Sequence, residues 1–433
     1  MLIQKILLKL RLRKIVSAST FKNISTLMTG TFIATIIPIL TAPIMSRIFT
    51  VSDYGVLGIY MAISGLIGVL AYSHYAQAIL LPKENDEAKQ VLWFSLFCSL
   101  IVSFTAFLIF ILFYFFTNII IDSALQFWYF FIPVSILLNG ISAILIIWAN
   151  RHQKYLQLSL NRIFQAIITV IVQITLGILF NNEVGLMVGL LTGQGISVIL
   201  LLNNFMNSND SGIGLPKPRM FKNIAYRYKN LLIYNTPSEF INNLINQSPI
   251  FLLQKFGGLS YVGNYNFTQR FLGLPQIFLS SAIVDVFKQK ASYSFNYYGN
   301  CKEVFLKTLK ILVAIAILPF IIIVFFAPSI FSFVFGTQWY DAGIFAQFMG
   351  IMFFFRFIVS PLTYVYIIAG KLREDFILHI LFLILTTLSF YVSDYFFEDK
   401  RYLILIYSIS YSLVYLIYLG RSYIFSKGKF IYR

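Results

Sequence analysis

A polar stripe interrupts an otherwise apolar stretch at residues 234–249, which read YNTPSEFINNLINQSP. Glu239, Asn243, Asn246 and Gln247 recur at helical spacing and would share one face of a helix. A few such groups are explained by hydrogen bonds between neighbouring helices. So many on one helix favour a face that lines a watery cavity, where carboxylates and amides can bind polar substrates.

Two arginines lie deep inside apolar segments, Arg270 within 258–286 and Arg356 within 342–369. Arg270 is about 12 residues into its segment, or roughly 18 Å deep at a rise of 1.5 Å per residue. A charge at that depth costs at least about 2.5–3.5 kcal/mol, so both arginines predict an anion site. Asn266 and Gln269 lie beside Arg270 and would share its donors. The alternative is a buried ion pair, for example between Arg270 and Glu239, and such a pair can open when an anion arrives.

Three titratable residues are candidates for proton or ion coupling, Glu239, His74 and Asp285. A lone histidine is more often structural, and Asp285 beside Lys288 is as readily a solvated helix end. The sequence contains none of the patterns GxxxxGK[ST], HExxH or CxxC, and it has only three His and two Cys. We therefore expect no catalytic centre, no metal site and no cofactor.

The composition indicates that a membrane holds these residues. Of 433 residues, 59% are hydrophobic and 11% are charged, whereas soluble domains have about a quarter charged residues. Long continuous apolar runs predict helices of about 20 residues each rather than a barrel. The predicted fold class is an all-α integral membrane protein of about twelve transmembrane helices. The segments are 22–48, 54–81, 90–117, 124–149, 155–180, 184–206, 230–255, 258–286, 304–327, 342–369, 376–396 and 402–425.

The distribution of Lys and Arg predicts the orientation of these segments. With a cytoplasmic N-terminus, only Arg47, Lys255, Lys400 and Arg401 fall in outside connections, and Arg270 and Arg356 lie within segments. The remaining basic residues all fall inside, as the positive-inside rule requires. Both termini are therefore expected in the cytoplasm. The same distribution explains the net charge of +17 without a nucleic-acid partner.

The connection between segments six and seven divides the chain into two related halves. We predict a cytoplasmic basic N-tail at 1–21, a six-helix bundle at 22–206, a linker at 207–229, a second six-helix bundle at 230–425 and a cytoplasmic C-tail at 426–433. Three pairs of short motifs match at offsets of 207, 206 and 208: KNISTLM with KNLLIYN, APIMSR with SPIFLLQK, and VSDYG with LSYVG. Because each half has an even number of helices, the repeat should be parallel.

The first hairpin carries a recognisable pattern, PIMSRIFTVSDYGVLGIY at 43–60 followed by AILLPKENDEA at 78–88. Over roughly residues 25–90 the chain resembles the Wzx-type flippases of O-antigen and capsular polysaccharide synthesis. These are polysaccharide biosynthesis proteins of the multidrug/oligosaccharidyl-lipid/polysaccharide exporter superfamily. Arg47, Asp53, Tyr54 and Gly55 occupy the family motif, and their position at a helix end and turn suggests a structural corner as much as a binding role.

The resemblance implies two six-helix bundles in a V around a central cavity, working by alternating access in the bacterial cytoplasmic (inner) membrane. The implied substrate is one oligosaccharide repeat unit on undecaprenyl diphosphate. Membrane lipids, a polysaccharide polymerase and a chain-length regulator are the implied partners. Basic cavities are a feature of the family, and Arg270 and Arg356 would suit that role, although no motif fixes them to family positions.

Three other functions compete with this interpretation. A cation-coupled multidrug exporter of the same superfamily would favour an acidic cavity, whereas Arg270, Arg356 and Glu239 together are net positive. A membrane-embedded polysaccharide polymerase or ligase would present a large external loop, whereas the external connections here are short. A purely structural partner protein would leave both buried arginines unexplained.

Overall fold

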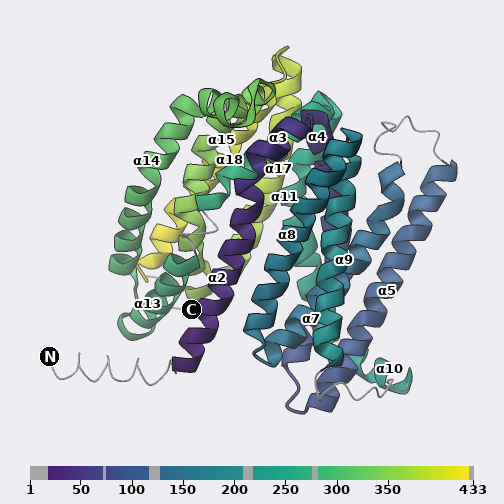
Figure 1. The fold of residues 1–433 in the computed structure, drawn as a ribbon. Coiled ribbons are helices and arrows are strands. Elements are labelled where there is room, and N and C mark those ends of the chain that lie inside the picture. The colour runs from purple at the N-terminus through teal and green to yellow at the C-terminus, as the bar shows by residue number, and fades with distance from the viewer. Residues whose placement is uncertain (1–17, 72–74, 117–126, 208–217, 276–280, 429–433) are drawn as a thin grey trace. The chain divides into compact units, whose positions relative to one another are not determined.

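The computed structural model describes residues 18–71, 75–116, 127–207, 218–275 and 281–428 (Figure 1). Helices and short turns make up these ranges, and none of their residues lies in a strand. The predicted all-α fold class is therefore confirmed. Most of the predicted N-tail, the first part of the predicted linker, the end of the C-tail and His74 lie outside the described residues.

Contacts between residues divide the chain into two compact units. Unit 1 comprises Met1–Ile48 and Tyr60–Asn243, and unit 2 comprises Phe49–Ile59 and Leu244–Arg433. The units meet at three boundaries: after Ile48, within α4 (Val51–Ala71) and within α11 (Thr236–Gly257). The beginning of α4 thus belongs with the second half of the chain.

Unit 1 contains the other helices of the first half. They are α2 (Ala18–Leu40), α3 (Ala42–Ile48), α5 (Asn85–Phe116), α7 (Ile132–Arg151), α8 (Tyr155–Phe180), α9 (Val184–Met206) and α10 (Pro218–Arg227). α8 packs against both α2 and α9, and α7 against α5 and α9. The contact between α8 and α9 is close because Gly189 and Gly193 leave room for Gln173 and Thr169. Small residues commonly bring membrane helices together in this way.

Unit 2 is organised around α15 (Tyr340–Val359), which packs against α12, α14 and α18. Its other helices are α12 (Leu259–Leu272), α13 (Ser281–Tyr298), α14 (Lys302–Phe335), α16 (Val365–Ile368), α17 (Leu372–Phe396) and α18 (Tyr402–Ser426). The span that contains α15 runs from Thr337 to Ile368, and 61% of its most apolar 18-residue stretch is buried. A 3₁₀ turn at Ser360–Tyr364 interrupts this span, because Pro361 cannot donate a helical hydrogen bond.

Ten helices in the described residues are long and apolar enough to cross a membrane, and they coincide with predicted segments one to six and nine to twelve. Segment seven forms α11 but falls below that level of hydropathy because of its Asn, Gln and Glu residues. Segment eight was predicted as one helix, which is wrong. α12 ends at Leu272, before Gly273 and Pro275, and α13 begins separately at Ser281.

Candidate functional site

The family-motif residues form the corner that begins α4. The Asp53 carboxylate accepts hydrogen bonds from the Thr50 backbone N–H at 2.7 Å and the Thr50 hydroxyl at 2.8 Å. The Asp53 N–H in turn donates to the Thr50 hydroxyl at 3.2 Å. This reciprocal capping satisfies groups that a helix start leaves unpaired. Arg47 lies exposed in the last turn of α3, before this corner.

The start of α4 crosses the start of α12 at very close range. A Cβ on Gly55 would overlap the Leu259 carbonyl, and a Cβ on Gly263 would overlap the Val51 carbonyl. The hydroxyls of Ser52 and Ser260 share a hydrogen bond of 3.2 Å between them. VSDYG and LSYVG, the motifs matched at an offset of 208, therefore contact each other reciprocally, as expected for a local two-fold axis.

Tyr54 anchors this crossing in the core of unit 2. Its ring packs edge-on against Phe267 and Trp339, with centroids 5.3 Å away in both cases, and Phe267 and Trp339 stack at 3.8 Å. Arg270 lies within electrostatic range of Tyr54 and is itself exposed, in the last turn of α12. Asn266 fills the space beside Gly58 of α4 and donates to the Val262 carbonyl at 3.1 Å.

Arg356 lies among four tyrosines of α12 and α18. They are Tyr265, Tyr407, Tyr411 and Tyr415, which we call the tyrosine cluster, and each interacts electrostatically with the guanidinium. The Arg356 guanidinium carbon is also 5.7 Å from the centre of the Phe353 ring, within cation–π range. Aromatic side chains thus lie near a positive charge inside a membrane span.

The tyrosine cluster is ordered by helical spacing. Tyr407, Tyr411 and Tyr415 follow one another at every fourth residue of α18, so their side chains share one face. The rings of Tyr411 and Tyr415 stack with centroids 4.9 Å apart and an interplanar angle of 9°. The Gln269 amide donates to the Tyr265 hydroxyl at 2.5 Å, which links this cluster to predicted residues of α12. The sequence analysis did not single out these tyrosines, although their i, i+4, i+8 spacing was a visible signal.

Neither Arg356 nor Arg270 has a carboxylate partner among the described residues of unit 2. Aromatic dipoles offset only part of the cost of burying a guanidinium. A half-buried Arg without a counter-charge, such as Arg356, attracts anions, and its planar fork suits phosphate oxygens. Of the cluster tyrosines, Tyr415 is half-buried and offers a ring face and a hydroxyl of the kind that sugars contact, whereas the other three are buried. The cluster has the chemistry to hold a sugar phosphate.

The polar stripe of α11 is divided between the units. Glu239 and Asn243 fall in unit 1, and Asn246 and Gln247 fall in unit 2. The Asn243 amide donates to the Glu239 backbone carbonyl at 3.0 Å. Glu239, Asn243 and Gln247 are half-buried, whereas Asn246 is exposed. Their roles in a cavity remain predictions.

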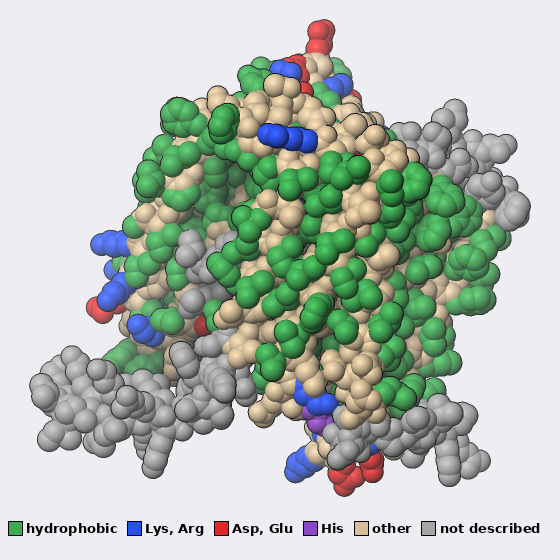
Figure 2. Space-filling view, viewed as in Figure 1, with side chains coloured by type: hydrophobic (Ala, Val, Ile, Leu, Met, Phe, Trp, Pro, Cys, Tyr) green, Lys and Arg blue, Asp and Glu red, His purple; other side chains and the backbone are tan. Residues whose placement is uncertain are grey.

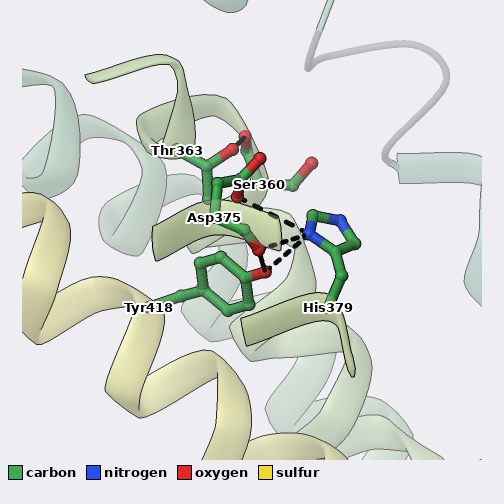
Figure 3. Close-up of polar contacts among 5 residues, drawn as sticks. All are labelled: Ser360, Thr363, Asp375, His379 and Tyr418. Atoms are coloured by element: carbon green, nitrogen blue, oxygen red, sulfur yellow. Dashed lines mark hydrogen bonds and ion pairs between the residues drawn. The ribbon is translucent and has the colours of Figure 1, made fainter. Parts of the chain in front are cut away.

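A second polar cluster joins α17 and α18, where the side chains of Asp375, His379 and Tyr418 converge (Figure 3). His379 Nδ1 is 2.8 Å from the Asp375 carbonyl oxygen and 3.6 Å from its carboxylate. Because a carbonyl only accepts, Nδ1 carries the proton in this arrangement. The Tyr418 hydroxyl donates to the same carbonyl at 3.3 Å. Sequence reasoning named His74 and Asp285 instead, and Asp285 is exposed near the start of α13.

Unit 1 has a charged residue, Arg162, inside a span. The sequence analysis had counted this residue among those on the cytoplasmic side. Arg162 lies two turns into α8 and donates to the Thr31 hydroxyl of α2. Its half-buried position shows that the first half of the chain also places a cation inside a span. The sequence analysis did not single out Arg162 because it lies near the start of the predicted segment 155–180.

The motif corner and the crossing lie in a sequence region that matches a known family, whereas Arg356 and the α18 tyrosines follow that region. The model of a polysaccharide biosynthesis protein family matches residues 44–343. The chain belongs to the polysaccharide biosynthesis protein family. The predicted membership of the polysaccharide biosynthesis proteins is thereby confirmed. Among curated proteins, no sequence matches the chain significantly.

Several solved membrane transport proteins share this fold. The chain is similar to the lipid II flippase MurJ in an inward closed conformation, with a TM-score of 0.70 and 16% identity over 92% of this chain and 89% of that one. It is also similar to an inward-facing multidrug resistance transporter of the MATE family and MOP superfamily, with a TM-score of 0.64 and 15% identity over 91% and 97% of the two chains. A MOP superfamily transporter from Pyrococcus furiosus Vc1 (DSM3638) gives a TM-score of 0.59 and 14% identity, covering 94% and 95%.

Proposed function

We propose that this protein is a flippase for lipid-linked oligosaccharide. It moves single repeat units on undecaprenyl diphosphate from the cytoplasmic to the outer leaflet of the bacterial cytoplasmic membrane, by alternating access and with both termini in the cytoplasm. The product would feed O-antigen or capsule synthesis through a polymerase and a chain-length regulator. Membership of a polysaccharide biosynthesis family supports this substrate class.

The observation that carries the proposal is the Arg356 guanidinium inside a membrane span, near the tyrosine cluster. A diphosphate head group must cross a hydrocarbon core of about 30 Å while its prenyl tail stays in lipid. The path needs a cation for the diphosphate and polar, flat surfaces for the sugars. Arg356 and the half-buried Tyr415 would supply both on neighbouring helices of one unit.

The remaining predicted residues fit the same role. Arg270 would be a second cation along the path, and Asn266, Gln269, Asn246 and Gln247 would offer amides to sugar hydroxyls. Glu239, with Asn243 beside it, is a candidate for ion coupling. A cationic drug would instead be repelled by arginines without carboxylate partners, so the arginines disfavour the exporter alternative.

A deletion strain of the source organism tests the proposal. Lipid-linked single repeat units should accumulate on the cytoplasmic side while surface polysaccharide disappears, and a plasmid copy should reverse both changes. A copy with Arg356→Ala should fail to complement at equal protein level. Arg373→Gln is the matched control, because Arg373 is an exposed arginine at the start of α17. Unchanged surface polysaccharide together with drug sensitivity would replace the flippase by the exporter.

A further inference from the structure

A pocket of about 550 Å³ lies along α13 and α14 in unit 2. The two helices are antiparallel neighbours joined by a short connection at 299–301, so the end of α13 lies opposite the start of α14. Lys290, Glu303 and Lys307 line the pocket near that connection, and Ile283 and Ile311 line it at the far end. The pocket is therefore amphipathic along its length.

The predicted position of α14 in the membrane shows which end of the pocket faces the membrane surface. The span begins at Lys302, so the charged end of the pocket lies where the helix enters the membrane. Figure 2 shows charged side chains, mostly Lys or Arg, gathered over the lower end of α14 and over α13. Beyond Ile311, exposed apolar side chains such as Ile317, Leu318 and Ile321 continue along α14. An aliphatic chain that leaves the pocket would follow this apolar surface.

The charged side chains of the pocket are available to a ligand. Lys290, Glu303 and Lys307 are exposed, and among the described residues none of them forms an ion pair or a hydrogen bond through its side chain. Two lysines and one glutamate give a net charge of +1. Glu303 lies in the first turn of α14, at the positive end of the helix dipole.

We propose that this pocket binds one anionic membrane phospholipid. Its phosphodiester lies between Lys290 and Lys307, and the first part of an acyl chain runs past Phe287 toward Ile283 and Ile311. A phosphodiester carries a single negative charge, which the net charge of the pocket matches, whereas a diphosphate carries more. A volume of about 550 Å³ suits a head group and the start of a chain, since ligand pockets hold roughly 300–1,000 Å³.

Native mass spectrometry of the full-length protein in detergent tests the proposal. Phosphatidylglycerol is the probe, phosphatidylcholine with the same acyl chains is the zwitterionic comparison without net charge, and undecaprenyl diphosphate is a competitor. Phosphatidylglycerol should bind with a 1:1 stoichiometry that phosphatidylcholine does not reach. Each lysine near an anionic lipid contributes about fivefold to binding, so Lys290→Gln with Lys307→Gln should weaken it at least tenfold.

Two further variants control for folding and for charge alone. Lys310→Gln removes the same charge one turn further along α14, outside the pocket lining, and should leave binding unchanged. Glu303→Gln raises the net charge of the pocket and should strengthen binding severalfold, which a misfolded protein would not do. Equal binding by the double variant and Lys310→Gln would overturn the proposal, as would a preference for undecaprenyl diphosphate. Because no arm measures transport, a failed flippase assay leaves this result unaffected.

Discussion

Ser52 and Ser260 lie 208 residues apart in the chain and share a hydrogen bond of 3.2 Å between their hydroxyl oxygens. They are equivalent positions of the two repeats, VSDYG and LSYVG. The neighbouring glycines repeat the relationship, since Gly55 meets the Leu259 carbonyl and Gly263 meets the Val51 carbonyl. The beginning of α4, up to Ile59, thus packs in unit 2 against the equivalent repeat rather than in unit 1.

A disulfide should form across this crossing. In a chain with Cys98→Ser and Cys301→Ser, Ser52→Cys with Ser260→Cys should oxidise within one molecule, because sulfur atoms at these positions would lie close to disulfide geometry. Mass spectrometry of the digested protein would detect the linked peptides. The two single-cysteine variants serve as controls. Two persistently free thiols in the double variant would show that the helix starts do not meet.

Alanine at Gly263 should destabilise the protein. A Cβ there overlaps the Val51 backbone carbonyl, which cannot move without shifting α4, and such overpacking costs about 1–3 kcal/mol. The melting temperature in detergent is the measurement. Gly195→Ala is the matched control, because a Cβ at Gly195 meets nothing within 4 Å. Equal melting temperatures for the two variants would contradict the close crossing.

The sequence predicted the spans whose signal is continuous hydropathy and missed features that depend on packing. Ten spans follow from apolar runs alone, and the repeat was visible as three motif pairs. The break after Leu272 was readable from Gly273 and Pro275, but the apolar residues on both sides concealed it. No local pattern indicates that residues 49–59 belong with the second half, because that placement depends on a contact 208 residues away.

The sequence predicted the charged residue of the candidate site but not the residues that lie around it. Arg356 stood out because placing a lone charge in an apolar segment costs free energy whichever residues pack against it. Tyr407, Tyr411 and Tyr415 did not stand out among 27 tyrosines, since aromatic residues are common throughout membrane helices. Only the packing of α18 against α15 shows which tyrosines face the arginine.

Removing one hydroxyl from the tyrosine cluster should weaken transport without harming the fold. Tyr411→Phe keeps the ring that stacks on Tyr415 and removes an oxygen beside Arg356. On the proposed function, we expect surface polysaccharide to fall severalfold, and Arg356→Lys to lower it further because lysine lacks the planar fork. Polysaccharide is measured per unit of membrane-inserted protein. Tyr395→Phe, at an 83% exposed position, is the control and should be silent.

The cluster of Asp375, His379 and Tyr418 should be energetically coupled. Tyr418→Phe removes the hydroxyl that lies 3.0 Å from His379 Nδ1 and 3.3 Å from the Asp375 carbonyl, which should cost about 1 kcal/mol of stability. In a His379→Leu background the same change should cost less, because part of the network is already lost. A double-mutant cycle on unfolding in detergent measures the difference. Strict additivity would mean that the three groups act independently.

The thiol of Cys301 should react unusually slowly. Cys301 lies in the connection between α13 and α14, fully buried, and its N–H donates to the Ser426 carbonyl at 2.8 Å. Burial raises the pKa of this thiol from 9.0 to about 11. Only the thiolate attacks a maleimide, so at pH 8 labelling should be about a hundredfold slower than for an ordinary thiol. In a Cys98→Ser chain the rate should rise about tenfold per pH unit between pH 8 and 10, and unfolding in detergent should restore fast labelling at pH 8. Rapid labelling of the folded protein at pH 7 would show that the end of α18 does not cover this connection.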